Sequence, residues 1–261
     1  MGASILSIAP EVLEMIGNMS DLEDIKNLRL CCRQLGQFLK KSILETISYN
    51  INVLNASASI TKLQCLGSGA SPGASRTTTN LILKRLTLKC NYNPGDTECY
   101  IDGKLAPVPK LPDDAELLSI EQETKKCLLP ALTALENVNS VSWRVLYQDN
   151  EWAQGAAMQA ILSFKHLRSL RLEFNTVVFG LPLHHLRGIE EISIVADDAK
   201  DTSGHRAQIW SNLAEMLSLN TNLTSLTVQV GNYMAYTYMH LMKAFGALVA
   251  TTRPFYPVAR I

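Results

Sequence analysis

Leu167-Arg168-Ser169-Leu170-Arg171-Leu172-Glu173-Phe174-Asn175 is the stretch that decides the fold of this chain of 261 residues. It follows the frame apolar-x-x-apolar-x-apolar, whose second half alternates as a half-buried strand does. The frame recurs along the chain, so the sequence holds an internal repeat with an irregular period. The other copies are Leu83-x-x-Leu86-x-Leu88, Val138-x-x-Val141-x-Trp143, Ile189-x-x-Ile192-x-Ile194 and Leu223-x-x-Leu226-x-Val228. Strict alternation predicts a further strand at Ile47-x-Tyr49-x-Ile51-x-Val53.

Helical patterns lie between these strand frames. Apolar residues share one helix face in three segments: Trp152, Ala156, Ala160, Ile161 and Phe164; Ile209, Leu213, Met216 and Leu217; and Met234, Tyr238, Leu241, Met242, Phe245 and Val249. A weaker pattern predicts a helix from Asp113 or Asp114 to about Leu129. Strands that alternate with helices form parallel sheets through right-handed crossovers, and repeated units of this kind stack as a solenoid.

The repeat frame, followed in two copies by Asn91 or Asn175, is similar to the leucine-rich repeat. The resemblance implies an α/β fold in which residues 49–261 form an irregular leucine-rich-repeat solenoid, a horseshoe of parallel strands and helices. Two stretches interrupt it. Residues 67–78 are rich in Gly, Ser and Pro and are expected to form a flexible loop, and residues 91–112 to form an irregular loop with a short hairpin around Asp102-Gly103.

Residues 1–48 are predicted to form a separate unit of three short helices. Pro10 stands at the first turn of one helix, Ser20-Asp21 caps the second, and an apolar set from Leu35 to Ile43 marks the third. A unit this small cannot bury a full core alone. Its apolar surface is therefore expected either to bind a partner or to pack on the rest of the chain.

Three runs in this unit resemble the F-box, especially its fungal form: Ile8-Ala9-Pro10-Glu11-Val12-Leu13-x-x-Ile16, Asp21-Leu22, and Asn27-Leu28-Arg29-Leu30-Cys31-Cys32-Arg33-x-Leu35. The resemblance covers roughly residues 5–48. It departs from the family where Ile8-Ala9 replace Leu-Pro and where Leu35 replaces a frequent Trp. The resemblance implies binding to a Skp1-like adaptor and, through it, to a cullin–RING ubiquitin ligase complex. The implied contact residues are Ile8, Pro10, Leu13, Ile16, Leu28, Leu30 and Cys31.

Composition narrows the class of protein. The formal net charge is zero, which argues against a general nucleic-acid binder. The apolar stretches are far shorter than the ~18 residues that span a membrane, and no basic region precedes an apolar core at the N-terminus. Six cysteines without a Cys-x-x-Cys motif fit a reducing compartment, either cytoplasmic or nuclear, and make a zinc site unexpected.

The sequence shows none of the common catalytic or nucleotide-binding motifs, such as Gly-x-Ser-x-Gly, Walker A or His-Glu-x-x-His. The chain is therefore expected not to be an enzyme and to hold neither a cofactor nor a metal. The side chains of His184 and His185 are expected to diverge rather than to chelate, because the two residues are adjacent. Asp197-Asp198, which follows a predicted strand, is interpreted as a loop cap.

A binding surface is predicted on the concave face of the solenoid. Side chains alternate along a strand, so residues between the buried apolar positions point to that face. They are mostly small and polar, and the charged residues assigned to the face are Arg85, Lys89, Arg144, Arg171 and Glu173. The leading hypothesis is an F-box substrate receptor that binds an unknown target protein through this face. The alternative is a leucine-rich-repeat-like binding scaffold without a ligase role, whose N-terminal helices only cap the solenoid.

Overall fold

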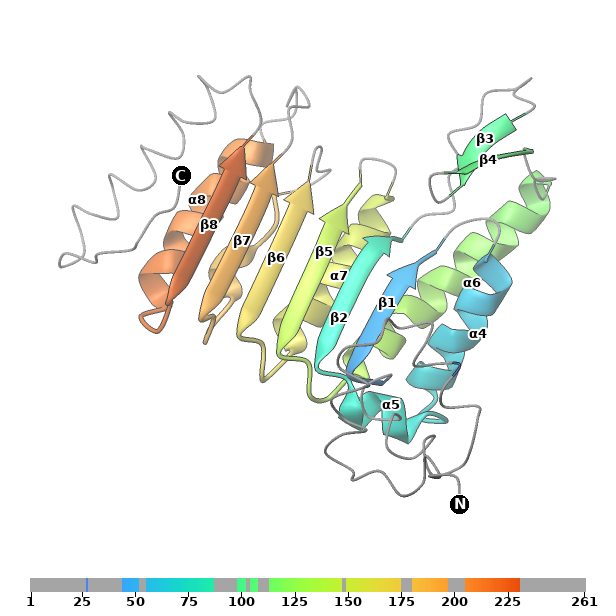
Figure 1. The fold of residues 1–261 in the computed structure, drawn as a ribbon, viewed down its shortest axis with the longest axis horizontal. Helices are drawn as coiled ribbons and strands as arrows, with labels where there is room; N and C mark the ends of the chain where they lie inside the picture. The colour runs from blue at the N-terminus through green and yellow to red at the C-terminus, as the bar shows by residue number, and fades with distance from the viewer. Residues whose placement is uncertain are drawn as a thin grey trace, which may run out of the picture.

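A computed structural model describes residues 27, 44–51, 55–86, 98–101, 104–107, 113–146, 149–174, 180–196 and 205–230 (Figure 1). The predicted F-box runs therefore lie outside the described residues, apart from Asn27. The predicted helix at 234–249 and the acidic pair Asp197-Asp198 lie outside them as well. Leu44 and Glu45 are helical and lead directly into the first strand.

The described residues form an α/β fold around a six-stranded sheet in which every strand runs parallel to its neighbours. The spatial order of the strands is their order along the chain, β1-β2-β5-β6-β7-β8. Their bounds are Thr46–Asn50, Asn80–Arg85, Ser140–Val145, Ser169–Phe174, Glu191–Ala196 and Ser225–Val230. The predicted parallel sheet is confirmed, and its arrangement is compatible with a solenoid. The sheet begins at Thr46, inside the range assigned from sequence to the N-terminal unit.

The helices that the structure describes lie on one face of this sheet or at the ends of its strands, and none of them covers the other face (Figure 1). In chain order they are α4 (Ala56–Gly67), α5 (Pro72–Thr77), α6 (Asp114–Thr133), α7 (Glu151–Ser163), the short 3-10 helix η2 (Leu183–His185) and α8 (His205–Leu219). The helix expected from Asp113 or Asp114 is confirmed as α6, but it continues past Leu129 and through Pro130. The Asp113 carboxylate caps it by accepting a hydrogen bond from the Glu116 N–H at 2.8 Å.

Four of the five predicted frames are confirmed by the strand register. Val141 pairs with Leu170, Leu170 with Ile192, and Ile192 with Leu226. The first three of these residues are almost fully buried. Because equivalent frame positions meet across four strands, the apolar side chains form one continuous layer between the sheet and the helices.

The first frame, placed from sequence at Leu83-x-x-Leu86-x-Leu88, is wrong. Leu81 and Leu83 pair with Val141 and Trp143, so the frame at β2 starts at Thr78. Thr78 is fully buried, and its hydroxyl donates to the carbonyls of Ala74 at 2.7 Å and Leu44 at 2.8 Å. A polar residue thus fills an apolar position because its hydroxyl is satisfied there. An apolar pattern cannot detect such a position.

The expected strand at 47–53 is confirmed in part. β1 ends at Asn50, and Val53 lies outside the described residues. Tyr49 and Ile51 are buried, as the alternation predicts, and the register shifts after Tyr49. Burial raises the pKa of the Tyr49 phenol far above its usual range.

The loop expected at residues 67–78 is a second correction. α4 reaches Gly67, and Pro72–Thr77 form the short helix α5. Pro72 stands in the first turn, where a missing backbone N–H costs nothing. The Ser75 hydroxyl also donates to the Ala134 carbonyl, which ties α5 to the end of α6. The short hairpin expected within residues 91–112 is confirmed as β3 (Glu98–Ile101) and β4 (Lys104–Pro107).

The helix faces predicted from sequence agree with the structure to different degrees. In α8 the predicted residues Ile209, Leu213 and Met216 are buried, as is Trp210. In α7 the predicted Ala160 and Ile161 are buried, but Trp152, Ala156 and Phe164 are only partly buried, and the rest of the buried face is made by Ala153, Ala157 and Met158. The face is displaced because small alanines, rather than the large aromatic residue, lie against the sheet.

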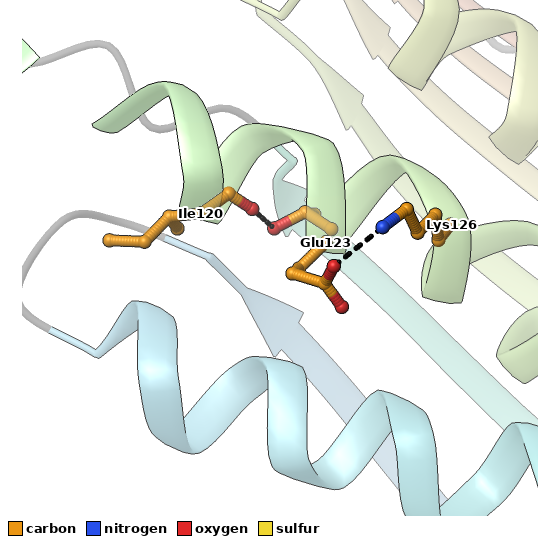
Figure 2. Close-up of polar contacts among 4 residues, drawn as sticks. Ile120, Glu123 and Lys126 are labelled. Carbon is orange, nitrogen blue, oxygen red and sulfur yellow. Dashed lines mark hydrogen bonds and ion pairs between the residues drawn. The ribbon is translucent and has the colours of Figure 1, made fainter. Parts of the chain in front are cut away.

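Within α6, polar groups that lie three or four residues apart also contact one another. Figure 2 shows the Lys126 ammonium donating to the Glu123 carboxylate at 2.7 Å on the exposed side of the helix. This hydrogen bond, with the charge of Glu123, raises the pKa of Lys126. One turn earlier, the Thr124 hydroxyl donates to the Ile120 carbonyl at 2.8 Å. Pairs of this kind stabilise a helix only slightly, so burial of Leu128 and Leu132 decides where α6 sits.

Candidate binding surface on the open sheet face

The open face of the sheet consists of in-register rows of mostly small polar side chains. We define the open face as two rows that cross all six strands: Thr46, Asn80, Ser140, Ser169, Glu191 and Ser225, and Ser48, Ile82, Ser142, Arg171, Ser193 and Thr227. All twelve residues are partly or fully exposed. The strands alternate, so these rows are the reverse side of the buried apolar layer.

A third, shorter row extends the open face and carries an ion pair. Arg144 on β5 faces Glu173 on β6, and the guanidinium Nε lies 3.2 Å from the carboxylate Oε1. Their side chains are 59% and 40% exposed, so the pair is screened by solvent and contributes little to stability. The pair does hold two long side chains in place across neighbouring strands.

Arg171 stands at the centre of the open face. It lies on β6 between Ser142 of β5 and Ser193 of β7, and it is exposed. The two nearby carboxylates are engaged elsewhere: Glu173 with Arg144, and Glu191 with the Ser169 hydroxyl at 3.3 Å. Its cross-strand neighbours are serines, so the long Arg171 side chain is flanked by short hydroxyl side chains. Such a group can donate several hydrogen bonds to a partner.

The structure brings three of the five predicted face residues together: Arg144, Arg171 and Glu173. Arg85 lies half-exposed at the end of β2, where the register with β1 shifts, and it stands outside the in-register rows. Lys84, which is exposed and precedes it, was missed because the frame at β2 was misplaced by five residues. Lys89 lies outside the described residues.

The residues assigned to adaptor binding are all outside the described part of the chain. They are Ile8, Pro10, Leu13, Ile16, Leu28, Leu30 and Cys31. The adaptor contact therefore remains a prediction from sequence, and the structure adds to the site only the sheet face.

The arrangement of the adjacent residues His184 and His185 differs from the one predicted. Their rings do not diverge, because His184 and His185 lie in the 3-10 helix η2 with ring centroids 4.0 Å apart. Within the described ranges, no group of three or more His, Cys, Asp or Glu side chains is arranged to hold a metal ion. Among the described helices, none combines the length and apolarity needed to cross a membrane.

Comparison with protein-family models, with curated proteins and with solved structures finds no match to this chain. The fold and the surfaces described above are therefore the basis on which function is argued.

Proposed function

We propose that this chain is the substrate-recognition subunit of a Skp1–cullin–F-box ubiquitin ligase. The observation that carries the proposal is the order and spacing of the Pro10–Ile16, Asp21-Leu22 and Asn27–Leu35 runs, which resemble an F-box over its whole length. In this proposal the N-terminal unit binds a Skp1-like adaptor and the repeat domain binds a target protein. The chain itself performs no chemistry; it brings the target to the ligase.

The strand register supports interpreting the second part as a leucine-rich-repeat-like solenoid. Equivalent frame positions pair with one another from β5 to β8. The residue directly before each of β5, β6 and β7 accepts, through its carbonyl, two hydrogen bonds from the next repeat. The Asn139 carbonyl, for example, accepts from the N–H groups of Arg168 and Ser169 at 2.8 and 2.9 Å. Repeats stacked in this way present one extended face, which solenoids commonly use for partner binding.

The chemistry of the open face supports its role in target binding. Serine and threonine side chains present donors and acceptors without filling the space above the sheet. Arg171 adds an exposed charge at the centre, and the Arg144–Glu173 pair adds a fixed polar edge. A target segment that lies across the strands can therefore approach the backbone closely and hydrogen bond to successive strands.

Co-purification with a Skp1-like adaptor tests the first half of the proposal. The wild-type chain is expected to retain the adaptor, Leu13→Asp to lose it, and Pro10→Ala to bind it more weakly. Leu118→Asp is the matched control, because Leu118 is a leucine on α6 that is already 60% exposed. Failure of the folded wild-type chain to bind the adaptor would remove the ligase role and leave a binding scaffold.

Charge reversal on the open face tests the second half. The double variant Arg144→Glu with Arg171→Glu is expected to abolish target capture while adaptor binding persists. The control, Lys125→Glu with Lys126→Glu, makes the same change in net charge on the exposed side of α6. Targets identified by quantitative mass spectrometry with the wild type should disappear only from the first variant. Unchanged capture by that variant would contradict the placement of the target site.

A further inference from the structure

A second charged surface lies in the two turns that lead into β6 and β7, at the end of the sheet where the strands begin. We define the basic turn patch as Lys165, His166 and Arg168, which precede β6, together with His185 and Arg187, which precede β7. All five side chains are exposed. Ser169 pairs with Glu191, so the two turns that lead into these strands lie side by side. The patch therefore lies at the N-terminal ends of these strands rather than on the open face.

Backbone contacts hold part of this patch in a fixed form. The Arg187 guanidinium donates through Nη1 to the carbonyls of His184 at 2.6 Å and Leu186 at 2.8 Å. Gly188 follows with φ of 73°, a conformation that favours glycine and turns the chain into β7. The ring contact between His184 and His185 restricts the second imidazole. The basic groups are thus presented from an ordered turn and lose less conformational entropy on binding.

With the histidines counted as neutral, Lys165, Arg168 and Arg187 give the patch its formal positive charges, and Glu190 offsets one of them. In the described part of the chain, the one carboxylate that pairs with the patch is Glu190, whose Oε1 lies 3.4 Å from Arg168 Nη1. That pair is well exposed and contributes little. Two further carboxylates belong to neighbouring segments: Glu191 on β7, which accepts from the Ser169 hydroxyl, and the exposed Glu136 in the turn before β5. The two turns themselves, residues 165–168 and 185–188, contain no Asp or Glu, although the whole chain has zero formal net charge.

We propose that the basic turn patch binds an acidic peptide segment of a partner protein. Clustered positive charge attracts carboxylates and steers their association. A nucleic acid is the less suitable occupant, because phosphate-backbone binding draws on an extended basic surface and an overall basic excess. The patch spans only two neighbouring turns, which suits a short run of Asp and Glu side chains. This inference goes beyond the proposed function and does not depend on it.

Fluorescence anisotropy with a labelled peptide of about ten glutamates tests the proposal at about 50 mM salt, where surface charges are weakly screened. The full chain is titrated into the probe. Lys165→Glu with Arg187→Glu is expected to weaken binding about tenfold or more, because two attractive contacts become repulsive. Lys165→Gln with His166→Gln leaves the hydrogen-bonded Arg187 in place and should weaken binding about threefold. Unchanged circular dichroism and thermal melting verify that each variant is folded.

The matched control is Lys62→Glu with Lys125→Glu, which changes the net charge by the same amount at exposed positions on α4 and α6. It should leave the affinity within about twofold of the wild type. Equal weakening by the control would show that overall charge, not the patch, binds the probe, and would overturn the proposal. So would the absence of any wild-type binding, or tighter binding of a single-stranded oligonucleotide of equal charge. Adaptor binding is measured in parallel, so failure here is distinguishable from failure of the ligase proposal.

Discussion

The buried hydroxyl of Thr78 stabilises the start of β2 through two carbonyls that belong to different segments. The Ala74 carbonyl belongs to α5, the helix that directly precedes Thr78, whereas the Leu44 carbonyl belongs to the segment that leads into β1. The contact therefore fixes the first two strands relative to each other. It also shows why a repeat that is defined by apolar residues can be misplaced by one buried polar residue.

Thr78→Val is expected to destabilise the protein by about 1 kcal/mol, although valine matches the apolar frame better and has nearly the same shape. The loss arises because the Leu44 carbonyl would lose its donor inside the fold. Urea denaturation followed by circular dichroism measures the change. Thr133→Val is the control, since the exposed Thr133 hydroxyl bonds only to carbonyls of its own helix. A stabilised Thr78→Val variant would show that the apolar frame outweighs the hydrogen bond.

At the scale of elements, buried polar side chains in the loops join neighbouring segments of the fold. The Asp149 carboxylate, almost fully buried, accepts from the N–H groups of Leu86 at 3.0 Å and Leu146 at 3.3 Å, joining the ends of β2 and β5. Asn220, after α8, donates to the carbonyls of Met216 at 2.7 Å and Leu186 at 3.1 Å and accepts from the Ile189 N–H at 3.0 Å. Asn220 thereby ties the end of α8 to the turn that leads into β7.

Asn220→Ala is expected to cost about 3 kcal/mol, because three hydrogen bonds are lost at a buried site and their backbone partners stay desolvated. Asn222→Ala, two residues away and exposed, should change the stability by less than about 0.5 kcal/mol. Thermal melting of both variants gives the comparison. Similar melting temperatures for the two would show that Asn220 does not anchor the turn.

At the scale of the whole molecule, stability is expected to vary along the sheet because each repeat packs mainly on its neighbours. Leu170 in the middle is 1% exposed, whereas Leu226 in the equivalent position of β8 is only partly buried. The two leucines pair with opposite sides of Ile192, so they report on the same layer at different positions.

Leu170→Ala is therefore expected to destabilise the chain by about 3 kcal/mol, and Leu226→Ala by about 1 kcal/mol. Denaturant unfolding monitored by tryptophan fluorescence measures both, since Trp143 and Trp210 are buried in the layer. Equal losses would mean that the layer is packed as tightly at β8 as in the middle of the sheet.

Hydrophobic periodicity in the sequence predicted the parallel strands at four frames and the α6 and α8 helices, while the Asp102-Gly103 turn signal predicted the hairpin within 91–112. It could do so because alternation and helical spacing are local properties of the chain. It misplaced β2 and missed α4 and α5, where polar and small residues such as Thr78, Ser59 and Ser75 are buried. Their burial depends on hydrogen-bond partners that no apolar pattern records.

Only the tertiary structure decided which side chains meet. The sequence named Arg144, Arg171 and Glu173 as members of one face, but their register paired Arg144 with Glu173 and left Arg171 between serines. The same register placed the turns of Lys165 and Arg187 side by side, although no motif joins them. The physical reason is that strand register is set by hydrogen bonds between segments that are distant in the sequence, while the pattern of each segment fixes only which of its faces is buried.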